Sequence, residues 1–522
     1  MVDTPQDPTS SSPPSPADTP PSEASPPPSP PKESPPSVTT EPPFPIQTPD
    51  STQAPPSEAI PPPPIPPPPP PEPGEPATPS GPPAEIVEPL FKRLLPLIIG
   101  VGVVILIILL VVKVILPKFQ KSKQPETVTL KYWGLWEPEN IISQIIKDYQ
   151  TDNPHVTVQY TRQSSKDYRE RLQSAFARDD GPDIFRWHNT WLPMLKNDLS
   201  PVPDSIYSSG DFATIFYPIV KEDVFSGNSY YGIPLEFDAL ALYINQDIFA
   251  TNSNLKIPTT WDNLRQTAFK LKQTNPATKK LIRGGVALGT TNNVDHFSDI
   301  LGLMILQNGG DPAKPDEDTV TSAMKFYTLF STQDKSWSES LPNSTYAFAT
   351  EKVAMIIAPS WRALEIKQLN PQLNFKLYPA PQLPGTNISW ATYWIEGVSK
   401  KSQNSQAAWA FIKYLSSKEV LTKMYNLASQ TRLFGEPYPR QDMASDLQED
   451  PFVGAVLSQA LSAQSWPMAS RTFDNGLNDK VIKYYQDAIN SYHQNIAEKN
   501  ITEALSQGVS QILSQYGLTT SQ

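Results

Sequence analysis

The sequence predicts an α/β protein of two compact lobes, preceded by a proline-rich tail and one apolar segment. Proline is concentrated before residue 90, and an uncharged apolar stretch covers residues 94–112. Beyond residue 126, short strand-like runs alternate with helical repeats, which is the rhythm of a parallel α/β sheet. Roughly 400 residues follow the apolar segment, more than one hydrophobic core usually organises, so we expect two lobes.

The tail differs in composition from the rest of the chain. Residues 1–90 hold 36 of the 61 prolines and a single aromatic residue, Phe44. Such a segment cannot bury enough apolar surface to offset the entropy of ordering it. We therefore expect residues 1–90 to be disordered, with polyproline II character.

The apolar segment has the length of a membrane span. Residues 94–112 carry no charged side chain, and 19 residues of α-helix extend about 28 Å, close to the hydrocarbon thickness of a bilayer. The segment begins far from the N-terminus and no small-x-small cleavage site follows it, so a cleaved signal peptide is disfavoured. We expect a transmembrane signal-anchor helix within residues 91–117 and a linker at 118–126.

Composition and motifs exclude several classes of protein. The chain has no cysteine, which rules out disulfides, thiolate zinc sites and cysteine nucleophiles. The formal net charge of −11 and the lack of a basic stripe argue against a nucleic-acid partner. The four histidines have no metal-ligand spacing, and no GxSxG, HExxH or Walker A motif occurs. We expect no metal, no cofactor and no enzymatic activity.

The soluble part opens with a strand–helix–strand–helix–strand pattern. Its expected strands and helices cover residues 127–133, 139–150, 155–160, 168–177 and 182–187. Further on, Thr260 is expected to cap a helix over residues 261–272. The later expected elements are buried strands at 239–245 and 353–358, an amphipathic helix at 407–415 and a continuous helical pattern over 480–516.

Eight sequence motifs follow one another in a characteristic order. They are YWGLWE (132–137), GPDIF (181–185), YGIPLEFDALALYIN (231–245), PTTWDNL (258–264), LMILQNGG (303–310), AMIIAPSWR (354–362), YPAPQLPG (378–385) and the closing segment 397–415. In this order the chain resembles the extracellular solute-binding proteins of family 1, the sugar-type receptors of ABC importers. The resemblance covers residues 127–415 and does not reach the tail or the apolar segment.

The resemblance implies a periplasmic-binding-protein-like fold of type II, with two α/β lobes that close on a ligand about a hinge. It places lobe 1 at about 127–236 and 390–434, and lobe 2 at about 239–385 and 438–522. We expect the chain to cross between the lobes near residues 234–238, 381–390 and 433–439.

The chemistry of sugars suggests which residues bind the ligand. Aromatic rings suit the C–H faces of a sugar, whereas carboxylates and arginines suit its hydroxyl groups. In relatives, the positions that match Trp187, Asp238 and Trp361 contact ligand. The candidate ligand-binding residues are Trp133, Trp136, Glu137, Trp187, Glu236, Asp238, Trp361, Arg362, Trp394 and Trp466. The competing interpretation is structural, with tryptophans in the core and with Glu236 and Asp238 as hydrogen-bonding residues of the hinge.

These inferences predict a membrane-anchored, monomeric solute-binding protein that captures a sugar or oligosaccharide for an ABC permease. The tail would be cytoplasmic and the binding domain extracytoplasmic. The lysines after the apolar segment conflict with this orientation, but long domains translocate largely regardless of such charges. The alternatives are a ligand-sensing receptor, an inert scaffold and, in a different class, a glycoside hydrolase with two catalytic carboxylates.

Overall fold

The computed structural model describes residues 90–110, 113 and 127–518. The chain divides into two compact units, residues 1–99 and 100–522, and each is described by itself. The predictions for the tail before residue 90 and for the linker at 118–126 lie outside the described residues.

A helix, α1 (Leu90–Leu110), lies where the sequence predicts one. Residues 111–112 and 114–117 of the predicted segment lie outside the described residues. Within the described ranges, no helix combines the length and the apolar character that crossing a membrane requires. The predicted transmembrane helix is therefore not confirmed.

The first sheet has the strand order β2-β1-β3-β13-β6. Its parallel part, β2 (Val156–Arg162), β1 (Val128–Gly134) and β3 (Ile184–His188), confirms the predicted strand–helix alternation. The intervening helices are α3 (Glu139–Asp152) and α4 (Tyr168–Ala177). The apolar face of α3 is buried, as its helical spacing predicts. The distant strand β13 (Trp394–Val398) pairs antiparallel with both β3 and β6 (Ile233–Pro234).

The second sheet has the order β11-β7-β10-β9-β8. Every residue of β7 (Leu240–Asn245) and of β10 (Val353–Pro359) is buried, which explains why both appear in the sequence as continuous apolar runs. The two strands pair antiparallel, and β7 also pairs antiparallel with β11 (Phe375–Pro379). At the other side of β10 lie β9 (Leu281–Val286) and β8 (Gln273–Thr274).

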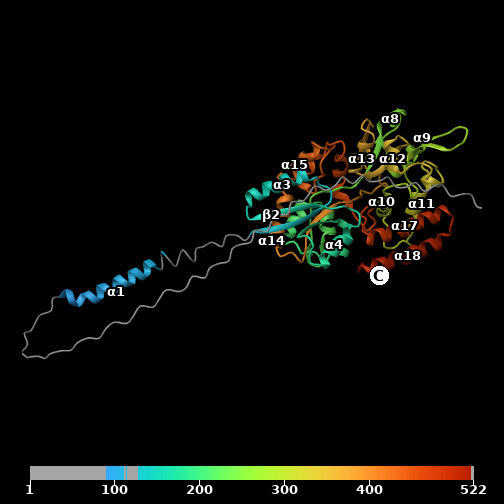
Figure 1. Ribbon diagram of the computed structural model, residues 1–522. Helices are drawn as coiled ribbons and strands as arrows, with labels where there is room; N and C mark the ends of the chain where they lie inside the picture. Colours follow the sequence, from blue (N-terminus) through green and yellow to red (C-terminus); the bar gives the residue numbers. More distant parts are fainter. Residues whose placement is uncertain (1–89, 111–112, 114–126, 519–522) are drawn as a thin grey trace, which may run out of the picture. The chain divides into compact units, whose positions relative to one another are not determined.

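Two of the predicted helices lie within two residues of their predicted bounds, the predicted cap of one is confirmed, and one helix prediction is wrong. Thr260 caps α9 (Trp261–Leu271) by accepting a hydrogen bond from the Asn263 amide. The predicted helix at 407–415 is α14 (Ser405–Leu415). The continuous pattern over 480–516 is two helices, α17 (Leu477–His493) and α18 (Glu498–Gln515), which lie side by side (Figure 1). The break falls where Asn495 adopts a left-handed conformation, which ends a helix.

The remaining helices and short strands complete the two halves of the domain (Figure 1). They are η2 (Asn189–Trp191), α5 (Leu192–Leu195), α6 (Ser209–Ile215), α7 (Pro218–Asp223), β4 (Phe225–Ser226), β5 (Ser229–Tyr230), α8 (Gln246–Ala250), α10 (Phe297–Gln307), α11 (Asp318–Thr332), α12 (Ser344–Ala349), α13 (Arg362–Leu369), β12 (Ser389–Trp390), α15 (Lys418–Ser429), η3 (Gln441–Leu447), α16 (Gly454–Leu457), η4 (Ala460–Ser462) and β14 (Ala463–Gln464).

The chain passes between the two sheets in three segments. The first joins β6 to β7 and the second leads from β11 to β13. The third runs from α15, which packs on α3, to α16, which packs on β7 and β11. Backbone hydrogen bonds tie the segments together: the Phe237 amide donates to Pro437 and the Thr392 amide donates to Asp238. The exact lobe limits and the closing motion stay predictions.

Candidate ligand-binding site

The first crossing segment carries an aromatic residue between two of the predicted carboxylates. Phe237 packs against Tyr217 and Tyr393, with ring centroids 4.9 and 5.6 Å away. Glu236 and Asp238 precede and follow Phe237 in the sequence. Their side chains make separate hydrogen bonds, Glu236 with Trp136 and Asp238 with the turn after β10.

Asp238 joins the first crossing to the turn that follows β10. Its carboxylate accepts hydrogen bonds from the Ala239 amide (2.7 Å), the Ser360 amide (3.0 Å), the Ser360 hydroxyl (2.9 Å) and the Trp361 amide (3.3 Å). Burial raises the pKa of Asp238 to about 7, although the donors from Ser360 oppose that shift. These contacts give Asp238 a structural role in the hinge, and its role in ligand binding stays a prediction.

Trp361 is the most accessible of the predicted tryptophans. It directly precedes α13 and is 37% exposed. The guanidinium of Arg362 lies over the ring, 4.3 Å from its centroid. The imidazole of His296 makes an edge contact at 5.6 Å. The ring is therefore held by two side chains while more than a third of the residue stays open to solvent.

Arg362 is buried among polar side chains. Only 2% of the residue is exposed. Its Nε donates to Nε2 of His296 at 2.9 Å, Nη1 pairs with Glu365, and Nη2 lies 4.0 Å from the carboxylate of Asp295. These neighbours and Trp361 surround the guanidinium, and a role of Arg362 in ligand binding stays a prediction.

Trp136 and Trp394 belong to one aromatic cluster at the first sheet. The Trp394 ring lies 5.1 Å from each of Trp136, Trp191 and His188, always with edge geometry. Trp136 and Trp394 are partly exposed, whereas His188 and Trp191 are buried. The sequence analysis did not select Trp191, although a tryptophan just after the end of a parallel strand was an available signal.

Hydrogen bonds connect this cluster to the crossings. The indole nitrogen of Trp136 donates to Glu236 at 3.3 Å, and Nε2 of His188 lies 3.1 Å from the Thr392 hydroxyl. Burial, together with the charge of Glu436, raises the pKa of Glu236 well above its ordinary value. Glu236 therefore lies beside the predicted aromatic platform, where it acts as a hydrogen-bond acceptor.

Glu137 takes part in a buried ion-pair network. It is 6% exposed and lies 2.5 Å from Nη1 of Arg186. Arg186 also pairs with Glu396 on β13 at 2.5 Å, and its guanidinium lies over Trp136, 5.1 Å from the ring centroid. The ion pairs place Glu137 in a structural role. The sequence analysis missed Arg186 and Glu396, because only the pairing of β3 with β13 brings them together.

Trp187 and Trp133 are packing residues of the first sheet. Trp187 is fully buried, and a Cβ added at Gly232 or Gly397 would come within 3.0 Å of its indole. The structure thus gives Trp187 a packing role, and its contact with ligand stays a prediction. Trp133 on β1 is partly buried and packs against the core.

Trp466 lines a cavity of about 680 Å³ together with Asp223, and Trp361 is not among the residues that line it. Asp223 accepts hydrogen bonds from the Tyr393 hydroxyl at 2.5 Å and from the Asn189 amide group at 2.9 Å. Tyr393 packs on Phe237 of the first crossing. A role of Trp466 in ligand binding stays a prediction.

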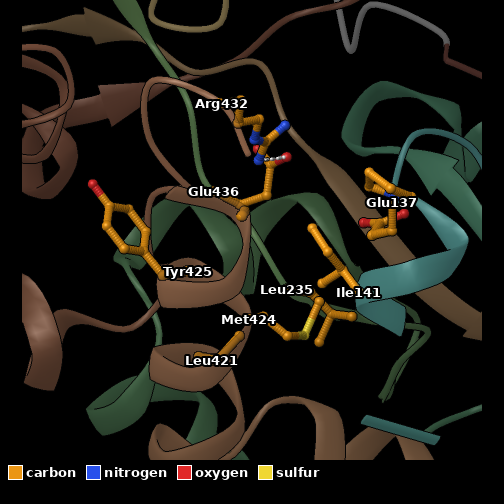
Figure 2. A pocket seen from close by; sticks show the side chains of 10 residues that line it. Glu137, Ile141, Leu235, Leu421, Met424, Tyr425, Arg432 and Glu436 are labelled. Carbon is orange, nitrogen blue, oxygen red and sulfur yellow. Dashed lines mark hydrogen bonds and ion pairs between the residues drawn. The ribbon is translucent and has the colours of Figure 1, made fainter. Parts of the chain in front are cut away.

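A small cavity lies between α15 and the segment after β1. Figure 2 shows its lining, where Leu235, Ile141 and Met424 lie below the ion pair of Arg432 with Glu436, whose atoms are 2.6 Å apart. Its volume of about 20 Å³ has room for a water molecule but not for a sugar. In the part of the chain that the structure covers, no cluster of three or more acidic or histidine side chains could hold a metal ion.

Comparison with known proteins places this geometry in a family. The family described as "Bacterial extracellular solute-binding protein" matches residues 136–421, so the chain belongs to that family. The multiple sugar-binding protein of Streptococcus mutans is 23% identical over 332 residues, which cover 59% of this chain and 76% of that protein.

Two solved structures show the same fold. The sugar-binding protein MalE of Xanthomonas citri superposes with a TM-score of 0.61 at 20% identity, covering 74% of this chain and 98% of that one. A cyclo/maltodextrin-binding protein in complex with maltotetraose gives a TM-score of 0.60 at 17% identity, covering 77% and 100%. The described domain therefore has the α/β fold of these binding proteins, as the sequence predicts.

Proposed function

We propose that this chain binds a sugar or oligosaccharide outside the cell and delivers it to an ABC permease. The observation that carries the proposal is Trp361, a partly exposed ring at the junction of the two sheets, held on the Arg362 guanidinium. The similar proteins named above are sugar-binding proteins by their descriptions. An indole ring with an accessible surface suits the apolar C–H face of a sugar.

The partly exposed rings of Trp136 and Trp394 supply aromatic surface on the other sheet. Glu236 and Asp238 lie between these rings and Trp361, because Glu236 accepts from Trp136 and Asp238 accepts from the Trp361 amide. A sugar bound here would contact both halves of the domain. Its contacts with both would favour the closed form, which is how differential binding drives hinge closure.

Titration calorimetry with a saccharide panel tests the proposal. The panel contains glucose, maltose, maltotriose and maltotetraose, and the control titrant is a polyol without a ring, such as glycerol. We expect saturable binding of at least one saccharide and recovery of that saccharide unchanged after long incubation. If every saccharide behaved like glycerol, the proposal would fail, and cleavage products would favour the hydrolase alternative.

We also propose that residues 94–112 tether the binding domain to the membrane, with the domain outside. The support is the sequence alone, which places 19 uncharged residues in a row. Protease added to intact cells, or to spheroplasts where an outer membrane is present, should degrade the binding domain and spare the tail. Protection of the domain would refute the orientation, and release of the chain by alkaline carbonate would refute the tether.

A further inference from the structure

Two partly exposed tryptophans share one arrangement, in which a buried arginine lies over the ring. Arg362 lies 4.3 Å from the centroid of Trp361, which follows β10 of the second sheet. Arg186 lies 5.1 Å from the centroid of Trp136, which follows β1 of the first sheet. The two arginines are only 2% and 1% exposed. The same pairing therefore occurs once beside each sheet.

The Arg362 guanidinium is fixed from several directions. Its Nε–H donates to Nε2 of His296, so that nitrogen must be unprotonated and the imidazole neutral, with its hydrogen on Nδ1. Nδ1 lies 2.8 Å from the Ser470 hydroxyl and 3.6 Å from the Asp299 carboxylate. Burial lowers the pKa of His296, which favours this neutral form. Glu365 pairs with Nη1 of the guanidinium.

The Arg186 guanidinium is fixed in a comparable way. Nε and Nη2 both donate to Oε1 of Glu396, at 2.8 and 2.5 Å, while Nη1 pairs with Glu137. The Tyr132 hydroxyl donates to the same Glu396 oxygen at 2.9 Å. Both guanidinium groups are thus paired with carboxylates and at the same time lie over an indole ring.

A buried cation is costly to maintain, and an apolar side chain would fill the space under an indole at lower cost. What a guanidinium adds is a flat, charged surface that attracts the ring face and restricts the ring to one orientation. A ring that is already fixed loses less freedom when a ligand stacks on it. The arginines are therefore better explained by orientation of the rings than by packing alone.

We propose that Arg362 and Arg186 are positioning residues, which hold Trp361 and Trp136 as pre-oriented platforms for the ligand. The use of these platforms rests on the sugar-binding function proposed above. The fixed orientation of the rings is a property of the protein without ligand and can be measured separately.

The first test uses fluorine NMR of the full-length protein labelled with 5-fluorotryptophan, without ligand. The Trp361→Phe variant identifies the Trp361 resonance by its disappearance. In Arg362→Met that resonance should shift and broaden, and in Arg362→Lys it should move part of the way. The control is Arg265→Met, because Arg265 is also paired with an acid, Asp334, at 2.5 Å, and this variant should leave the resonance in place. An unchanged Trp361 resonance in Arg362→Met would overturn the proposal.

The second test is a double-mutant cycle measured by calorimetric titration with maltotriose. Arg362→Met should weaken binding about 3- to 30-fold, the range that cation–π contacts span from exposed to desolvated sites. In the Trp361→Ala background the same change should have no further effect, since the arginine acts through the ring. An equal loss in both backgrounds would refute the positioning role. If the unmodified protein bound no maltotriose, that result would count against the proposed ligand, while the NMR test would still decide the positioning role.

Discussion

Replacement of Trp361 by alanine separates a ligand platform from a core residue. Trp361 is 37% exposed, so roughly two thirds of the residue is covered, and Arg362 and His296 are among its contacts. A fully buried tryptophan changed to alanine costs about 3–5 kcal/mol of stability, so we expect about 2–3 kcal/mol for Trp361. The loss of a stacking surface should cost about 1–3 kcal/mol of binding free energy, or roughly 5- to 150-fold in affinity.

The matched control is Trp409→Ala, because Trp409 is fully buried in α14. It should lose the full 3–5 kcal/mol of stability, as estimated for a core tryptophan, and keep its affinity wherever it stays folded. Urea denaturation gives the free energy of unfolding. Calorimetric titration at about 15 °C gives the affinity, because proteins are near their maximal stability at about this temperature. The reasoning would be wrong if Trp361→Ala lost stability like Trp409→Ala while its affinity stayed normal.

Three further predictions test the packing and the pH dependence. Because the pKa of Asp238 is raised to about 7, its contribution to the free energy of unfolding should fall as pH rises from about 4 to about 7; Asp238→Asn should flatten that slope in urea melts, and an unaltered slope would contradict the assignment. Trp187→Ala should lower stability by about 3–5 kcal/mol without a specific loss of affinity; a stable variant with weak binding would restore Trp187 as a ligand residue. A protein that begins at residue 127 should fold and bind as the full chain does, by melting curve and titration, and loss of binding would show that the preceding segment contributes.

The first sheet and the buried strands of the second were predictable because their signals are local. The alternation of β1, the helical spacing of α3 and the Thr260 cap each depend on residues that are close together in the sequence. The fully apolar runs of β7 and β10 indicate strands that are covered on both faces. The family motifs added the order of the elements and the approximate places where the chain crosses between sheets.

The roles of the predicted site residues could not be predicted in the same way. Trp187 and Trp361 both follow or end a strand in the sequence, yet one is fully buried and the other is 37% exposed. The difference arises because β13, more than 200 residues after β3, pairs with β3 and places Gly397 against the Trp187 indole.

The sequence by itself determined the class of fold, the order of its elements and the family to which the chain belongs. Only the tertiary structure decided that the Arg362 guanidinium lies over the Trp361 ring, and that Glu137 belongs to a buried ion pair with Arg186. The physical reason is that strands and helices follow from the periodicity of neighbouring residues. The exposure and charge environment of a side chain depend on distant segments, which the sheets bring into contact.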